Sequence, residues 1–197
     1  MKIDPALVPA GTAVLSMDMQ NGIISLYAGS HPEMLARAAQ VLHAARARGM
    51  AIIHIRMGFR AGLPEVSPRN PLFSAIRGSE QHQRLFSGEM GEVHPVLGPA
   101  PNDIVIAKHR VSAFTGTELD MILRAKEIDT LVLFGIATSG VVLSTLLHAS
   151  DADYRILVLD DCCAEMDAEV HRFLLDKVFP RRATVCTAAD FLEAVRP

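Results

Sequence analysis

The segment from Leu131 to Thr145 constrains the fold of this chain more than any other. It reads LVLFGIATSGVVLST, which is an apolar run, a turn of small residues between Gly135 and Gly140, and a helical pattern. Such a turn is typical of the carboxyl end of a buried strand in an α/β protein, where N–H groups at the start of the next helix converge. At the start of the helix, where an enzyme would carry a Cys or Ser nucleophile, the chain has Gly140 and Val141.

Apolar runs of strand length alternate with helical patterns along the chain. Near-continuous apolar strands separated by helices indicate a parallel sheet that is covered on both faces. We therefore predict an α/β protein with three α/β/α layers and a six-stranded, mostly parallel, Rossmann-like sheet. The predicted strands are Thr12–Met17, Ala51–Ile55, Asp103–Ala107, Leu131–Phe134, Arg155–Leu159 and Ala183–Cys186, and the predicted helices cover about 30–48, 117–127, 140–150 and 167–178, with a short last helix after Thr187.

Residues 56–102 interrupt this alternation. The segment is rich in Gly, Pro, Ser and charged residues, and only about 72–76 has a helical pattern. A long irregular segment inside a compact domain is more often functional than not. We treat 1–197 as one domain in which 56–102 is a candidate lid or partner-contact segment.

Composition excludes several classes of function. The net charge is −3 and Lys and Arg form no long run, so nucleic acid is not an expected partner. No signal-peptide pattern and no apolar run of about 18 residues is present, so we expect a cytoplasmic protein without a membrane partner. The three cysteines have no C-x-x-C spacing, so we expect buried thiols and neither a metal nor another cofactor.

Polar residues follow three of the predicted strands. Asp18 ends the first, Lys108 ends the third, and the Gly135–Gly140 turn ends the fourth. Because the carboxyl ends of parallel strands meet at one edge of a sheet, we expect these groups to lie together. A neighbouring Lys would keep Asp18 ionised, whereas burial would raise its pKa and let it carry a proton. The alternative is that Asp18 caps a loop and Lys108 is solvated.

Other polar residues have simpler interpretations. His54, within an apolar strand, is expected to be a core or strand-end histidine with a satisfied N–H group. Thr138 or Ser139 is expected to cap the following helix.

Several motifs resemble the isochorismatase-like hydrolases, also called cysteine hydrolases. The motifs are Asp18-Met-Gln-Asn-Gly22 after an apolar strand, Lys108-His-Arg-Val-Ser-Ala-Phe114 after another, and Gly135-Ile-Ala-Thr138 before a helix. The similarity continues through Thr117-x-Leu119, Ser144-Thr145, Asp160-Asp161 and His171, and it covers nearly the whole chain except about 56–102. The order and spacing of the motifs together are more specific than any one of them.

The resemblance implies a catalytic Asp–Lys–Cys set, in which Asp18 and Lys108 match the first two members. It places the family nucleophile at Val141, which cannot attack a substrate. It also implies a cis peptide between Ile136 and Ala137, in a turn whose N–H groups face an oxyanion. Further implied features are Thr138 in that turn, Met19 and Ile23 as walls of the substrate pocket, and a homodimer or higher homo-oligomer.

The departures from the family pattern leave three hypotheses open. The chain reads His54-Ile-Arg56 where the nicotinamidase branch has the metal pattern Asp-x-His, so that activity is disfavoured. The first hypothesis is a hydrolase that needs no thiol, with Asp18 as general acid and Lys108 as its partner on a vinyl-ether or carboxylate substrate. The second is an inactive relative that binds a small metabolite, and the third is an oligomeric scaffold.

Overall fold

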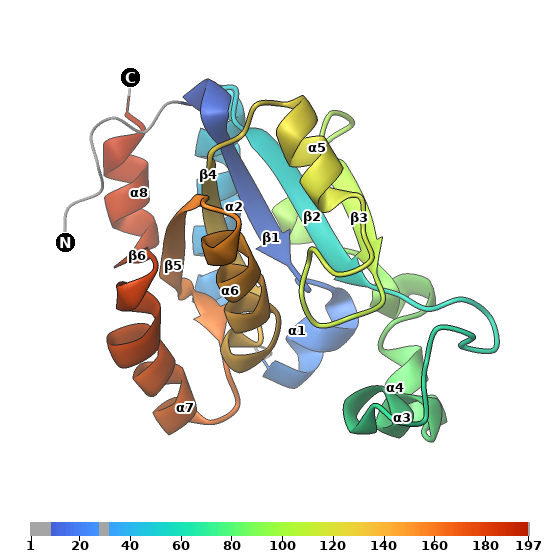
Figure 1. Ribbon diagram of the computed structural model, residues 1–197. Helices are drawn as coiled ribbons and strands as arrows, with labels where there is room; N and C mark the ends of the chain where they lie inside the picture. The colour runs from blue at the N-terminus through green and yellow to red at the C-terminus, as the bar shows by residue number, and fades with distance from the viewer. Residues whose placement is uncertain (1–8, 28–31, 197) are drawn as a thin grey trace.

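The computed structural model describes residues 9–27 and 32–196, which form a single six-stranded sheet with helices on both faces (Figure 1). The strand order is β3-β2-β1-β4-β5-β6, and every pair is parallel. This topology confirms the predicted fold class. The strands are β1 (Thr12–Met17), β2 (Ala51–Met57), β3 (Ile104–Lys108), β4 (Thr130–Ile136), β5 (Arg155–Ala164) and β6 (Thr184–Cys186).

Eight α-helices accompany the strands in the described part of the chain. In Figure 1, α5 and α6 lie in front of the sheet and α2 lies behind it, while α8 packs against α2. The predicted start of α2, at about residue 30, lies outside the described residues. The helices are α1 (Asn21–Tyr27), α2 (Pro32–Ala47), α3 (Pro71–Arg77), α4 (Glu80–Arg84), α5 (Leu119–Ala125), α6 (Leu143–Asp151), α7 (Ala168–Phe173) and α8 (Ala188–Ala194).

The main hydrophobic core lies on both faces of the central strands. Every residue of β1 and β4 is buried, which explains why both strands are apolar without alternation. Gly135 lies where β4 comes closest to β1. It has φ +145°, and a Cβ atom there would come 2.0 Å from the Met17 carbonyl oxygen, so this close approach requires glycine.

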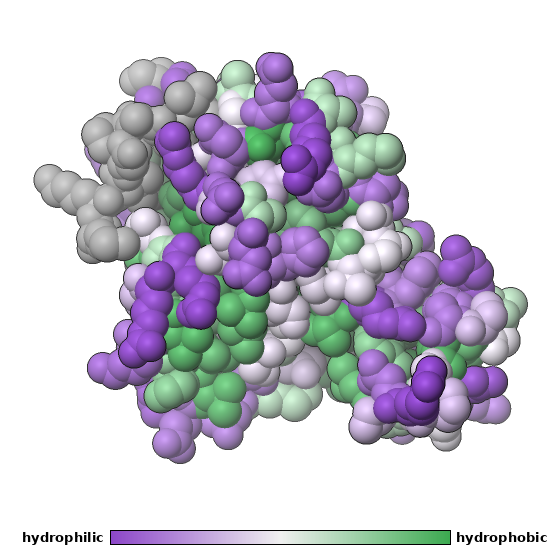
Figure 2. All heavy atoms as spheres, in the orientation of Figure 1, coloured by the Kyte–Doolittle hydropathy of each residue, from purple (hydrophilic) through white to green (hydrophobic). Residues whose placement is uncertain are grey.

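Residues 58–102, here called the arm, carry α3 and α4, and the part with these two helices stands out from the sheet as a separate lobe (Figures 1 and 2), whereas Leu97 is buried in the main core. A small second core supports the arm, and it includes Phe73 and Ile76 from α3 packed with Met57 and Val66. The helical pattern predicted at about 72–76 is confirmed. Within the described residues, no helix has both the length and the apolar character needed to cross a bilayer.

Strand β5 differs from its prediction. It continues to Ala164, five residues beyond the predicted end at Leu159. Leu133 pairs with Val158, but Gly135 pairs with Cys163, so extra β5 residues bulge out of the ladder. A bulge accommodates charged residues inside a strand, and Asp160-Asp161 therefore lies within β5 instead of ending it.

Candidate active site

Asp18 and Lys108 form an ion pair at the carboxyl edge of the sheet. Lys108 Nζ lies 2.9 Å from Asp18 Oδ2, and the exposed fraction is 0% for the lysine side chain and 11% for the aspartate side chain. Asp18 follows β1 with φ 53°, and its N–H group donates to the Ile55 carbonyl at 2.8 Å. Lys108 Nζ also donates to the Arg110 carbonyl at 3.1 Å. The contact predicted between the ends of two strands is present, and the alternative of a solvated Lys108 is wrong.

Burial governs the protonation of Asp18. Desolvation raises the pKa of its carboxyl group, while the charge and hydrogen bond of Lys108 and the Met57 N–H group lower it; burial is the largest effect, and the net direction is upward. Asp18 Oδ2 contacts Lys108, whereas the buried Oδ1 has no hydrogen-bond partner among the described residues. This second oxygen is free to bind or transfer a proton.

The turn after β4 lies beside this pair because β4 is the neighbour of β1. The peptide between Ile136 and Ala137 is cis, at the place that the resemblance implies. The Ala137 carbonyl accepts hydrogen bonds from the N–H groups of Gly140 at 3.0 Å and Val142 at 3.3 Å. Val141, between them, is 2% exposed. The turn is therefore tightly wound and presents an apolar side chain, with no thiol or hydroxyl at position 141.

Residues at the end of β5 and in α7 hold this turn in place. The Thr138 hydroxyl donates to the Ala164 carbonyl at 3.2 Å and lies 2.9 Å from His171 Nδ1, which must then be the donor in that contact. Ser139 donates its backbone N–H group to Glu165 Oε2 at 3.0 Å, and its hydroxyl contacts the same oxygen. The prediction that Thr138 or Ser139 caps the helix is wrong, because no side chain of the turn does so.

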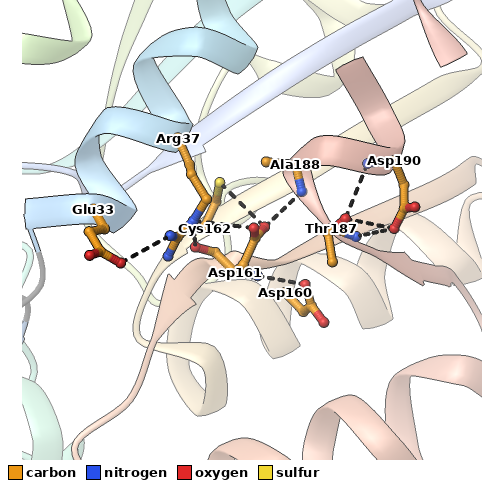
Figure 3. Close-up of polar contacts among 8 residues, drawn as sticks. All are labelled: Glu33, Arg37, Asp160, Asp161, Cys162, Thr187, Ala188 and Asp190. Atoms are coloured by element: carbon orange, nitrogen blue, oxygen red, sulfur yellow. Dashed lines mark hydrogen bonds and ion pairs between the residues drawn. The ribbon is translucent and has the colours of Figure 1, made fainter. Parts of the chain in front are cut away.

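Asp161 joins three elements on the other side of β5 (Figure 3). Its Oδ2 lies 3.2 Å from Arg37 Nε of α2, and its Oδ1 accepts the Ala188 N–H group at the start of α8 at 2.7 Å. Asp160 Oδ1 accepts the Asp161 N–H group at 2.7 Å. The Asp160-Asp161 motif therefore ties the sheet to α2 and α8, and Asp161 has a structural role.

Gln20 is a residue that the sequence analysis did not single out. Its Nε2 donates to the carbonyls of Met57 at 2.9 Å and Gly91 at 2.8 Å, and its Oε1 accepts the Met57 N–H group at 2.8 Å. It thereby ties the loop that carries Asp18 to β2 and to the arm. Met19 is buried and Ile23 is half-buried against the main core, so their place in a substrate pocket stays a prediction.

The three cysteines are buried, as free thiols. Burial raises the pKa of Cys162 far above its usual value, and it raises those of Cys163 and Cys186 to about 12. Burial therefore disfavours the thiolate form that a nucleophilic cysteine needs in all three. Among the described residues, no group of three or more His, Cys, Asp or Glu side chains could hold a metal ion.

Comparison with known proteins identifies the family of this chain and agrees with its fold. The family model described as Isochorismatase domain matches residues 12–190. An uncharacterised isochorismatase family protein, YecD of Escherichia coli O157:H7, is 30% identical over 93% of this chain and 96% of its own length. Ureidoacrylate amidohydrolase RutB of Methylobacterium radiotolerans is 32% identical over 96% and 81%. The solved structure of an isochorismatase family protein from Burkholderia thailandensis has a TM-score of 0.82 at 30% identity and covers 98% of this chain and 97% of its own.

Proposed function

Because this chain belongs to the isochorismatase family of hydrolases, we propose that it hydrolyses a small vinyl-ether or carboxylate metabolite without a thiol nucleophile. Asp18 is the general acid and base, and Lys108 is its cationic partner. One observation carries the proposal: a buried Asp18 carboxyl group with one unpartnered oxygen lies against Lys108, beside a turn that has valine at the position of the family nucleophile.

Protonated Asp18 would begin the reaction by giving its proton to the terminal carbon of the vinyl ether. The carbon that bears the ether oxygen becomes an oxocarbenium ion, and water adds to it while its proton returns to the Asp18 carboxylate. The hemiketal then breaks into a ketone and an alcohol, which completes the hydrolysis. General acid catalysis of this kind contributes about 10²–10⁴-fold.

Lys108 and the turn after β4 would supply electrostatic stabilisation of the charges that form during the reaction. The Lys108 ammonium group stabilises the Asp18 carboxylate after the proton has left, because the two groups are already in contact at 2.9 Å. Backbone N–H groups of the turn, at Ala137 and Val141, would bind a carboxylate or carbonyl oxygen of the substrate. Val141 would contribute an apolar wall and would allow no covalent intermediate.

The alternative is an inactive relative that binds a small metabolite or serves as an oligomeric scaffold. It is favoured by Val141 itself, since an amidase of the cysteine-hydrolase type needs a nucleophile at that position. Under this alternative, the Asp18–Lys108 pair would bind a ligand and transfer no proton.

Turnover of isochorismate separates the two. We expect slow hydrolysis by the wild-type protein and a loss of about 10²–10⁴-fold in Asp18→Asn, with no comparable loss in Asp160→Asn, a matched control at a half-buried carboxylate. No turnover on a panel of vinyl ethers, amides and esters, together with a higher Tm in the presence of a carboxylate, would favour the inactive binder. Unchanged activity in Asp18→Asn would exclude Asp18 from the chemistry.

A gain-of-function variant tests the geometry of the turn. If position 141 is the family's nucleophile position, the thiol of Val141→Cys should react with iodoacetamide or give detectable amidase activity. The wild-type chain, whose native thiols are buried, is the control. A completely inert thiol in the variant would show that the turn does not have the geometry of a cysteine hydrolase.

A further inference from the structure

Gln20, in the loop that follows Asp18, is fully buried and has partners for both polar atoms of its side chain. Its Nε2 group donates to the carbonyl oxygens of Met57 and Gly91, and its Oε1 accepts the Met57 N–H group at 2.8 Å. Only the NH₂ end of an amide can donate, so the two carbonyls fix the orientation of the side chain. Gln20 Oε1 therefore has to face the Met57 N–H group.

The arm holds the loop that carries Gln20. Gln20 forms an isolated antiparallel bridge with Val93. Asn21 Nδ2 donates to the Glu89 carbonyl at 2.8 Å, and the Gly91 carbonyl accepts Gln20 Nε2 at the same distance. The position of the Gln20 amide therefore depends on the arm as well as on β2.

The Met57 N–H group faces the Asp18 carboxyl group as well as Gln20. It lowers the pKa of Asp18, although burial raises that pKa by more. Its hydrogen bond goes to Gln20 Oε1, while Asp18 Oδ1 is buried without a partner in the described part of the chain. A backbone N–H group that donates to a carboxylate stabilises the charged form and lowers the pKa. Gln20 and Asp18 therefore compete for one donor, and Gln20 holds it.

We propose that Gln20 is a positioning residue for Asp18: it binds the Met57 N–H group and thereby keeps this donor away from the Asp18 carboxyl group. The inference rests on the proposed function, because a carboxyl group without that hydrogen bond keeps its proton to a higher pH and can donate it. The amide of Gln20 is neutral, so it occupies the donor without placing a charge beside Asp18. Since the Gly91 carbonyl holds this amide, the arm takes an indirect part in the chemistry of the site.

The charged surroundings of Asp18 allow this role to be measured. Lys108 of β3 is the charged group that acts on Asp18. Strand β4 and the turn after it carry no ionisable side chain between residues 130 and 142. The ionisable side chains of β2 pair with other groups, and the pairs are Arg56–Glu92 at 3.1 Å and His54–Asp103 at 3.2 Å. A change in the titration of Asp18 when Gln20 is replaced can therefore be assigned to the Met57 N–H group.

The test follows the titration of Asp18 by carbon NMR of its carboxyl group, assigned with Asp18→Asn, and needs no substrate. In Gln20→Met the Met57 N–H group loses its acceptor and turns to Asp18, so the midpoint should move to lower pH by about one pH unit. In Gln20→Glu an acceptor oxygen remains, so the midpoint should stay or rise. The control is Gln83→Met, which removes an amide that donates to two carbonyls elsewhere in the arm and should leave the midpoint unchanged.

The two Gln20 variants separate positioning from loosening of the loop, because loosening would affect both in the same direction. A midpoint that does not fall in Gln20→Met, or that falls equally in Gln20→Glu, would overturn the proposal. If Gln20→Met does not fold, the wild-type protein decides the point. The Met57 amide nitrogen should then show a coupling across the hydrogen bond to Gln20 Cδ, and its absence, or a coupling to Asp18 Cγ, would contradict the proposal.

The pH profile of turnover links this role to the proposed function. When a protonated acid is required, kcat/KM falls above the pKa of that acid in the free enzyme, so the fall should begin about one pH unit lower in Gln20→Met. A shifted NMR midpoint in a protein without turnover would leave the positioning role intact and exclude the proposed function. Turnover that depends on Asp18, with an unshifted midpoint in Gln20→Met, would do the reverse.

Discussion

Two buried aspartates, one at the amino ends and one at the carboxyl ends of the strands, differ in how completely their carboxylate oxygens are hydrogen-bonded. Asp103 lies at the amino end of β3, and both of its oxygens have partners: Arg46 Nε donates to Oδ1 at 3.1 Å and Arg46 Nη2 donates to Oδ2 at 2.6 Å. The Ala100 N–H group and His54 Nε2 also contact Oδ2, at 2.9 and 3.2 Å. Asp18, at the carboxyl edge, contacts the single cation Lys108 and keeps one oxygen without a partner.

The two environments move the pKa values in opposite directions. Burial raises the pKa of Asp103, but the hydrogen bonds from Arg46, the Ala100 N–H group and His54, with the charge of Arg46, outweigh burial and hold the pKa below its usual value. For Asp18, burial outweighs Lys108 and the pKa is raised. A carboxylate whose oxygens are all bonded stabilises the fold, whereas one that is buried and incompletely bonded is available for proton transfer.

The largest expected effect is a loss of stability when the Asp103 cluster at the amino ends of the strands is disrupted. Asp103→Asn removes the charge that pairs with Arg46 and disturbs five hydrogen bonds, so we expect a loss of about 3 kcal/mol in the free energy of unfolding. Urea unfolding followed by circular dichroism measures it. The control is Asp120→Asn, which breaks an exposed pair with Arg124 and should change stability little. If the urea midpoint of Asp103→Asn equalled that of the wild type, the Asp103 cluster would not be structural.

The next largest effect is expected on stability when both members of an ion pair, Asp18–Lys108 or Asp103–Arg46, are replaced together. The double variant Asp18→Asn/Lys108→Met should lose less stability than either single variant, because removal of both members leaves no unpaired buried charge. Asp103→Asn/Arg46→Met should remain destabilised, since the His54 and Ala100 donors keep their need for a strong acceptor. Urea midpoints of both double variants and their single parents decide the point. Equal losses in the two double variants would remove the proposed distinction between the structural and the functional pair.

The sequence predicted the Asp18–Lys108 pair because strand ends in a parallel sheet share one edge, and the apolar runs that became β1 and β4 located those ends. It did not predict the Asp103 cluster, since it treated His54 as a core histidine with a satisfied N–H group. His54 is buried as expected, and its Nε2 lies 3.2 Å from Asp103 Oδ2, which gives its N–H group the expected partner; Nδ1 has no hydrogen-bond partner among the described residues. The pairing depends on where α2 places Arg46, which no local pattern encodes.

The contacts that hold the turn after β4 were also not predicted from the sequence. Glu165 reaches Ser139 because β5 continues past Leu159 through a bulge. Apolar periodicity ends at Asp160-Asp161, so a pattern-based reading stops the strand there. Two of the groups that hold the turn, the Ala164 carbonyl and the Glu165 carboxylate, therefore come from a segment that the sequence alone places in a loop.

The smallest expected effect is the pH dependence of stability. It is also the sharpest test, because the contributions of Asp103 and Asp18 to stability should change with pH in opposite directions. The pKa of Asp103 is lowered in the folded state, so its stabilising contribution is present above the ordinary pKa of 3.8 and is lost as the pH falls through the lower folded pKa. The stability gap between wild type and Asp103→Asn should stay constant near neutral pH and narrow in acid.

The pKa of Asp18 is raised in the folded state, so its contribution is complete below 3.8 and is lost as the pH rises through the higher folded value. The stability of the wild type relative to Asp18→Asn should therefore decrease with rising pH. Urea unfolding of the three proteins between about pH 3 and 8 measures both trends. If the two stability differences between wild type and variant changed in the same direction with pH, both carboxylates would lie in the same kind of environment. In that case Asp18 would be a second structural anion, and a proton donor would have to be sought elsewhere at the carboxyl edge of the sheet.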